Sequence, residues 1–193
     1  MARAHESLCW LKRGIVVWGS AALVLALSAC GSDPARPGKG PGPHFKIGQP
    51  YKINGTWYYP EFVTEYEEVG IASWYGSSFH GRPTANGEVY DMYALTAAHP
   101  TLQLPSVVEV VNLENGRSVT LRVNDRGPFV KGRLIDLSFA AARELGFARK
   151  GLARVQVRYL GLAPLDEPPI RPGERRQYAA LACELPQPER LVC

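Results

Sequence analysis

Short apolar segments separated by turns fill residues 70–161, and this pattern limits the fold more than any other feature of the chain. An Asn-Gly pair at 115–116 joins two such segments and is typical of a tight hairpin, because it tolerates positive φ. One helix is expected at 138–145, where Ser138 can cap its first turn and Gly146 can end it. The pattern predicts a mainly β domain, a small closed barrel. The expected strands are 71–75, 94–98, 107–112, 119–123 and 154–160.

The length of 193 residues allows one ordinary domain and little more. The formal net charge is +4, and +2 of it lies ahead of Cys30. The remaining +2 is too small to indicate nucleic acid or an anionic membrane surface as a partner. We therefore expect no nucleic-acid partner.

Residues 1–29 are typical of a bacterial lipoprotein signal peptide. A positively charged start precedes an apolar stretch at 14–29, which is short for a membrane-spanning helix of about 20 residues. The sequence Leu-Ser-Ala-Cys at 27–30 resembles a lipobox, in which Cys30 carries several acyl chains that give stable anchoring. The alternative is an uncleaved signal anchor with an incidental cysteine. Gly31 stands where an Asp would favour the inner membrane, so we expect an outer-membrane lipoprotein facing the periplasm.

Three further segments flank the barrel. Residues 30–43 are rich in Gly and Pro and are expected to form an extended tether. Residues 44–69 form an aromatic lead-in that either packs against the domain or extends a sugar-binding groove. Residues 162–193 are a Pro-rich tail expected to be irregular. In this tail Cys183 and Cys193 form either a disulfide or two free thiols, because the sequence does not fix the approach of their backbones.

Polar motifs are concentrated in the barrel segment. They bring together carboxylates, one His, one Arg and a Trp-Tyr pair beside turns. A core needs none of these groups, and buried charge is costly unless it is paired, so the motifs indicate a cleft. The motifs are GIASWYG at 70–76, TANGE at 84–88, TAAH at 96–99, NDRGPF at 124–129 and IDLS at 135–138.

The two aspartates that follow apolar segments also have structural interpretations. Asp125 can simply tie down Arg126 or neighbouring amides in a turn. Asp136 can cap the helix that follows it, but Ser138 is available for that purpose. Asp136 is then free to project into a partly apolar groove, where burial raises a carboxyl pKa toward that of a useful acid.

The other polar residues leave comparable alternatives open. Glu88 and Asp91 are either solvated loop acids or members of the cleft. His99 is structural or catalytic, and no second His stands at metal-ligand spacing, so no metal or other cofactor is expected. Trp74 and Tyr75 are either core residues or a flat stacking surface for a sugar ring.

Taken together and in this order, the five motifs closely resemble the rare lipoprotein A (RlpA) family. The resemblance implies a six-stranded double-psi β-barrel with one or two short helices over residues 70–161, a fold shared by expansins and some lytic transglycosylases. It also implies an endolytic transglycosylase that cleaves the MurNAc-GlcNAc β-1,4 bond of peptidoglycan and leaves 1,6-anhydro ends. By the same resemblance the expected acid and base is Asp136, the other polar cleft positions are Glu88, His99 and Asp125, and sugar contacts fall to Trp74, Tyr75 and Asp91.

Two other classes of function fit the same motifs. One is a non-catalytic, expansin-like module that binds the wall, and the other is a scaffold that recruits division-site proteins. The expected partners are peptidoglycan glycan strands and a membrane, with division-site proteins as a further group. About 30 residues follow Gly161, too few for the SPOR domain of many relatives, so the sequence leaves septal targeting open.

Overall fold

The structure is a computed structural model that describes residues 42–174. The signal peptide, nearly all of the tether, the lipidation residue Cys30 and the pair Cys183 and Cys193 lie outside the described residues. No helix within 42–174 has the length and apolar character that crossing a membrane requires.

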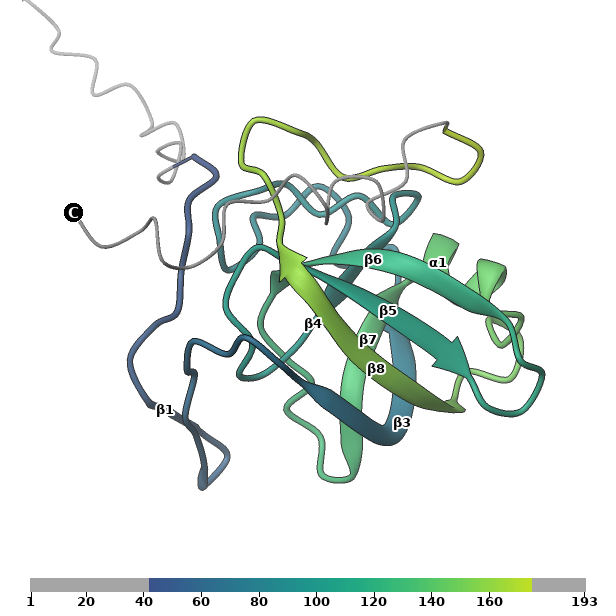
Figure 1. Ribbon diagram of the computed structural model, residues 1–193, viewed down its shortest axis with the longest axis horizontal. Coiled ribbons are helices and arrows are strands. Elements are labelled where there is room, and N and C mark those ends of the chain that lie inside the picture. Colours follow the sequence, from purple (N-terminus) through teal and green to yellow (C-terminus); the bar gives the residue numbers. More distant parts are fainter. Residues whose placement is uncertain (1–41, 175–193) are drawn as a thin grey trace, which may run out of the picture. The chain divides into compact units, whose positions relative to one another are not determined.

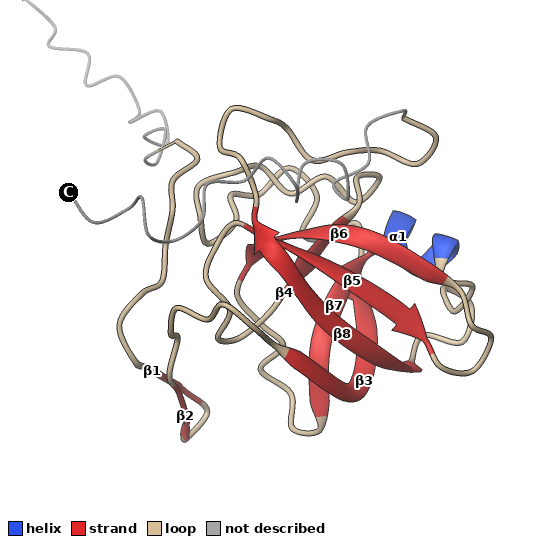
Figure 2. Cartoon of the chain, in the orientation of Figure 1, coloured by secondary structure: helices blue, strands red, loops and turns tan. Residues whose placement is uncertain are grey.

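Eight strands and one short helix make up the described chain (Figure 2). Their bounds are β1 Tyr51–Ile53, β2 Thr56–Tyr58, β3 Glu67–Tyr75, β4 Thr96–Ala98, β5 Ser106–Asn112, β6 Ser118–Asp125, β7 Arg133–Ser138, α1 Phe139–Glu144 and β8 Ala153–Leu162.

Six of these strands close into a barrel in the order β3-β7-β4-β6-β5-β8 (Figure 1). The β3–β7 and β4–β6 pairs are parallel, and the other pairs are antiparallel. This topology confirms the predicted small six-stranded barrel, mainly β with one short helix among the described residues. Its strands run from Glu67 to Leu162, slightly beyond the predicted 70–161.

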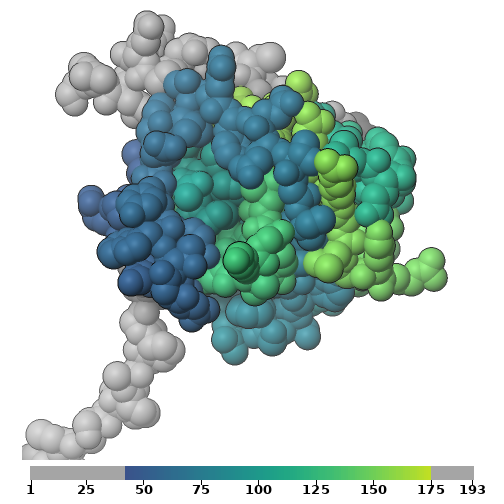
Figure 3. All heavy atoms as spheres, turned by 90° about the horizontal axis from the view of Figure 1, so that it is seen from below, coloured from purple at the N-terminus to yellow at the C-terminus, as the bar shows by residue number. Residues whose placement is uncertain are grey.

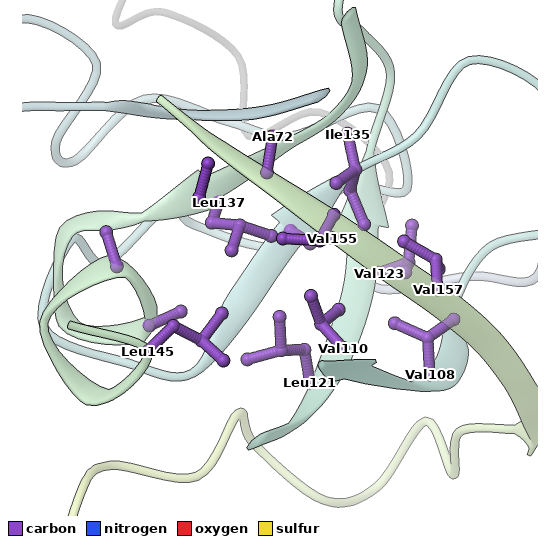
Figure 4. Packing of buried hydrophobic residues seen from close by; sticks show 14 of the residues in the cluster. Ala72, Val108, Val110, Leu121, Val123, Ile135, Leu137, Leu145, Val155 and Val157 are labelled. Carbon is purple, nitrogen blue, oxygen red and sulfur yellow. The ribbon is translucent and has the colours of Figure 1, made fainter. Parts of the chain in front are cut away.

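The interior of the barrel is filled by branched apolar side chains (Figure 4). Successive residues of a strand point to opposite faces, so Ile135 and Leu137 of β7 enter the core while Asp136 between them points outward. β7 was not among the strands predicted from sequence, because its short apolar alternation was interpreted only as the approach to helix α1. Ser138 caps that helix, accepting a hydrogen bond from the amide of Ala141 at 3.1 Å.

The lead-in contains a hairpin that the sequence analysis did not predict. Asn54 and Gly55 turn between β1 and β2 with φ values of 49° and 82°, as a tight turn of this kind requires. Tyr51 and Tyr58 pack edge-on against Phe129, with ring centroids 6.0 and 5.5 Å away. Figure 3 shows this lead-in, in dark blue, beside the green atoms of the barrel. One face of the lead-in therefore packs against the domain.

The described part of the tail, residues 163–174, contains no helix or strand but is packed against the barrel. Ala163 and Ile170 are buried with Val107 of β5. The amide of Leu95 donates to the carbonyl of Ile170 at 2.7 Å, which ties the tail to the residue just before β4.

Candidate active site

Four residues form a row across four adjacent strands on the outer face of the barrel. Ser73 of β3 is paired with Asp136 of β7, Asp136 with Ala98 of β4, and Ala98 with Asp125 of β6. We call these four residues the carboxylate row. Directly paired residues share a face of the sheet, so the two carboxylates lie on either side of a methyl group. Two strand spacings place their backbones about 10 Å apart.

A bulge in β6 brings Asp125 into this row. The β4–β6 register pairs Ala97 with Val123 and then Ala98 with Asp125, passing over Asn124. Two residues of β6 therefore oppose one residue of β4. Bulges of this kind re-aim side chains and are frequent next to active sites.

Asp136 is held by two neighbours. Its Oδ1 accepts the Ser73 hydroxyl at 2.5 Å, and its Oδ2 lies 3.3 Å from Nη2 of Arg133. Nη1 of Arg133 also donates to Ser73 Oγ at 2.9 Å, so the three side chains form one connected group. Burial raises the pKa of Asp136, and the Ser73 hydrogen bond and the Arg133 charge oppose this rise without cancelling it. Asp136 therefore has the environment of a proton donor.

Asp125 is held through one oxygen only. Its Oδ1 accepts the amides of Ala85 at 2.9 Å and of Arg126 at 2.8 Å, and no donor among residues 42–174 reaches its Oδ2. Burial raises the pKa of Asp125, against the opposing effect of those two amides and of the Arg126 charge. Asp125 Oδ1 therefore ties down the neighbouring amides, which is the structural role that the sequence left open. Asp125 Oδ2 remains free for another contact within the described residues.

The Trp-Tyr pair divides between the two faces of β3. Tyr75 lies on the same side as Ser73, and burial together with the carboxylates of Asp125 and Asp136 raises its pKa well above the ordinary value. Its ring stacks on Tyr90 at 4.2 Å.

Trp74 points the other way. Its ring packs against Phe139 at 5.2 Å, and its indole N–H donates to the carbonyl of Ala148 at 3.0 Å. A sugar-binding role for Trp74 stays a prediction, and this placement favours the packing alternative.

His99 follows Ala98 directly and is buried and neutral. Its Nδ1 accepts the amides of Thr101 at 3.3 Å and Leu102 at 3.1 Å, which assigns the ring proton to Nε2. Nε2 lies 3.0 Å from the hydroxyl of Tyr66, which in turn donates to Glu68 at 2.8 Å. Burial, with the nearby charge of Arg126, lowers the pKa of His99 to about 3. This environment favours a structural role for His99 at the end of β4, and a catalytic role stays a prediction.

Glu88 lies in a buried ion pair with Arg122. Arg122 donates to both carboxylate oxygens through Nε at 3.0 and 3.1 Å and through Nη2 at 2.6 Å. The amides of Asn86 and Asn124 add hydrogen bonds of 2.7 and 2.9 Å. All four side chains are buried. A catalytic role for Glu88 stays a prediction, and this network favours a positioning role that fixes the loop at 84–91 against β6.

Asp91 and Arg126 each join separate segments of the chain. Asp91 accepts the guanidinium of Arg171 at 2.6 and 3.1 Å and the amide of Tyr93 at 2.9 Å. Burial raises the pKa of Asp91, but these partners outweigh it and hold the pKa below its ordinary value. Arg126 donates to the carbonyls of His99, Leu102 and Ile47, which braces the lead-in against the end of β4.

Two functional partners were missed by the sequence analysis. Arg133 and Arg122 each stand in or beside an apolar segment, where a charge is unexpected unless it is paired. A charged residue at such a position was the sequence signal that could have identified both arginines as paired groups. Within residues 42–174, no group of three or more His, Cys, Asp or Glu side chains is arranged to hold a metal ion.

The closed barrel with carboxylates on its outer face defines a double-psi β-barrel protein with an acidic site. Residues 67–157 match the model of the lytic transglycolase family. Over 118 residues the chain is 58% identical to the endolytic peptidoglycan transglycosylase RlpA of Pseudomonas aeruginosa, covering 61% of this chain and 34% of that protein. Its identity to the protein of the same name from Helicobacter pylori is 54% over 113 residues, 58% of this chain and 36% of that one.

Residues 67–157 of the barrel domain are thus similar to the lytic transglycolase family, and the resemblance to RlpA proteins is confirmed. The match spans about a third of the length of these two curated relatives. Among solved structures, a Streptomyces papain inhibitor aligns with a TM-score of 0.40 and 24% identity over 48% of this chain and 94% of that one.

Proposed function

We propose that this protein is an endolytic peptidoglycan transglycosylase that cleaves the MurNAc-GlcNAc β-1,4 bond. The observation that carries the proposal is the carboxylate row. Asp136, which contacts Ser73 and Arg133, lies on one side of Ala98. Asp125 lies on the other side of Ala98. The relatives named as peptidoglycan transglycosylases support the choice of substrate.

Asp136 acts first as acid and then as base. It gives its proton to the glycosidic oxygen as the bond from that oxygen to the muramic C1 breaks. The muramic C6 oxygen forms the new bond to C1, and its hydroxyl proton passes to Asp136, which restores the starting state. No water is consumed. The raised pKa of Asp136 favours the protonated form that the first step needs.

Asp125 stabilises positive charge on the sugar ring in the transition state through its unshared Oδ2. Ser73 and Arg133 orient Asp136, while His99 and Glu88 fix the chain on either side of the row. Tyr75 and Asp91 remain candidates for sugar contacts.

We also propose that acyl chains on Cys30 attach the mature protein to a membrane. The expected location is the outer membrane, with the protein facing the periplasm. The support is the sequence Leu-Ser-Ala-Cys at 27–30 and the Gly/Pro-rich tether that follows it. Cys30→Ala should leave the protein unprocessed or release it from membranes in fractionation. Full processing with continued membrane attachment would contradict the anchoring proposal.

The experiment that tests the activity is digestion of purified sacculi, and of glycan stripped of peptides, by the full chain. Mass spectrometry should find 1,6-anhydromuramic ends. Reducing ends would instead mean that water attacks C1, with Asp125 as its activating base. Bound but uncut glycan would identify a non-catalytic wall-binding module.

A further inference from the structure

The β1–β2 hairpin presents aromatic rings to solvent. Trp57 and Tyr59 are 52% and 62% exposed, and their rings lie 6.3 Å apart with an angle of 27° between planes. Lys52 is paired with Trp57 across the hairpin, and its ammonium group lies 5.7 Å from the centre of the indole ring. We call Lys52, Trp57 and Tyr59 the aromatic platform.

Packing of the hairpin does not account for this platform. Alternation along the two strands sends Tyr51 and Tyr58 to the opposite face, and these two rings make the contacts with Phe129. The aromatic platform lies on the face of the hairpin that makes none of these contacts with Phe129. Its two nearly parallel rings and one adjacent cation form a ligand-sized surface rather than a scattered exposure.

The hairpin is fixed to the end of the carboxylate row by several contacts. The Tyr51 hydroxyl donates to the carbonyl of Pro100 at 2.7 Å, two residues after Ala98. Phe129, on which the hairpin packs, is four residues beyond Asp125, at most about 14 Å of extended chain. Arg126 also donates to the carbonyl of Ile47 at 2.6 Å, just ahead of the hairpin. The platform therefore keeps a constant position relative to the row.

We propose that the aromatic platform binds sugar rings of the same glycan strand that is cut at the carboxylate row, an inference that rests on the proposed function. Flat aromatic faces stack on the apolar C–H faces of pyranose rings. The Lys52 ammonium complements the lactyl carboxylate, which is free on muramic residues whose stem peptide has been removed. An enzyme that cuts inside a strand must hold sugars beyond the scissile bond, and a fixed second contact supplies that hold.

Binding of the full chain to two defined probes tests this inference. The Asp136→Asn variant serves as the background so that no strand is cut during co-sedimentation. Trp57→Ala with Tyr59→Ala should weaken binding to peptide-stripped glycan about tenfold or more. Lys52→Gln should weaken binding to peptide-stripped glycan, whose lactyl carboxylates are free, more than binding to intact sacculi, where stem peptides hold these groups in amide bonds. Tyr93→Ala removes a ring that is 54% exposed elsewhere and is the matched control, with binding unchanged.

Unchanged glycan binding in the double variant, with an unchanged unfolding midpoint, would overturn the inference. So would a loss seen only with phosphatidylglycerol vesicles, because the platform would then face a lipid surface. The activity of the unmutated chain is measured separately. Failure to form products would count against the proposed function, whereas the binding comparison would still report on the platform.

Discussion

Ser73 donates its hydroxyl to Asp136 across the parallel strands β3 and β7, at 2.5 Å. The parallel register places the two residues side by side, and Arg133 at the start of β7 contacts both of them. Burial and the Arg133 charge act on the Asp136 pKa in opposite directions. The proton affinity of the proposed acid is therefore set by neighbours that substitution can change one at a time.

Replacing Asp136 by Asn should abolish activity while leaving glycan binding nearly intact. Asn keeps the shape and the hydrogen bond with Ser73 but cannot transfer a proton. Because both proton transfers use this residue, the loss should exceed the ~10²–10⁴-fold typical of one acid–base step. Release of anhydromuropeptides measures it. Glu109→Gln, on β5 away from the row, is the control. Residual activity within tenfold of wild type would remove Asp136 from the mechanism.

Replacing Arg133 by Gln should move the basic limb of the pH–rate profile to higher pH. The proposed first step needs protonated Asp136, so activity falls as pH rises through its pKa. Arg133 lowers that pKa, and its removal therefore raises it. Lys131→Gln removes a nearby cation with no contact to Asp136 and should leave the limb in place. A loss of rate with an unmoved limb would mean that Arg133 is only structural.

The sequence predicted the barrel because its strands carry a strong local signal. β-branched residues in β5 and β6, joined at Asn115 and Gly116, define a hairpin that the structure confirms. β7 carries only Ile135 and Leu137 as inward residues, and its pairing with β3 and β4 is remote in sequence. Such a strand is stabilised by partners that no local pattern reveals.

The candidate site residues were chosen from the sequence, but their arrangement was not predicted. Polar residues beside turns indicated which side chains gather, yet the positions of Asp125 and Glu88 depend on longer-range structure. The bulge that passes over Asn124 and the partner Arg122 are set by cross-strand register. A residue buried in an ion pair and one lining a cleft look alike in a single sequence. The membrane anchor and the role of the tail cysteines stay predictions.

Glu88→Gln should destabilise the fold as well as lower activity. The change leaves the buried Arg122 guanidinium without its counter-charge, which typically costs about 3–5 kcal/mol. Urea unfolding followed by intrinsic fluorescence measures the difference. Glu114→Gln breaks an exposed pair with Lys150 and should leave the midpoint where it is. Lost activity with full stability would instead favour a direct catalytic role for Glu88.

His99 should make the protein less stable in acid. Its folded pKa of about 3 lies below the ordinary value of 6.5, so the unfolded chain binds a proton first as pH falls. The stability that His99 contributes is fully present above pH 6.5. It is lost as pH falls toward 3, at up to about 1.4 kcal/mol per pH unit. In His99→Gln this part of the slope should disappear from the unfolding free energy measured between pH 6.5 and 4. An identical slope in both proteins would show that the ring titrates normally.

Gly70 should be required by the close approach of β3 to Leu134, which precedes the core residue Ile135 of β7. A Cβ added at Gly70 would lie 2.6 Å from the Leu134 Cβ, closer than carbon atoms tolerate. The register between these strands shifts just after this point, between Ile71 and Ala72. Gly70→Ala should cost roughly 1–3 kcal/mol in urea unfolding, whereas Gly42→Ala, in open space, should be near neutral.

A double-mutant comparison separates this clash from a general loss of β3 packing. The cost of Gly70→Ala should shrink in a Leu134→Gly background, because that change removes the Cβ that is struck. It should persist in a Leu134→Ala background, which keeps that atom. Equal costs in all three backgrounds would mean that Gly70 is needed for another reason. β7 also carries Asp136. If β7 moves to relieve the clash in Gly70→Ala, the hydrogen bond between Ser73 and Asp136 is distorted. The rate of glycan cleavage should then fall in proportion to that distortion.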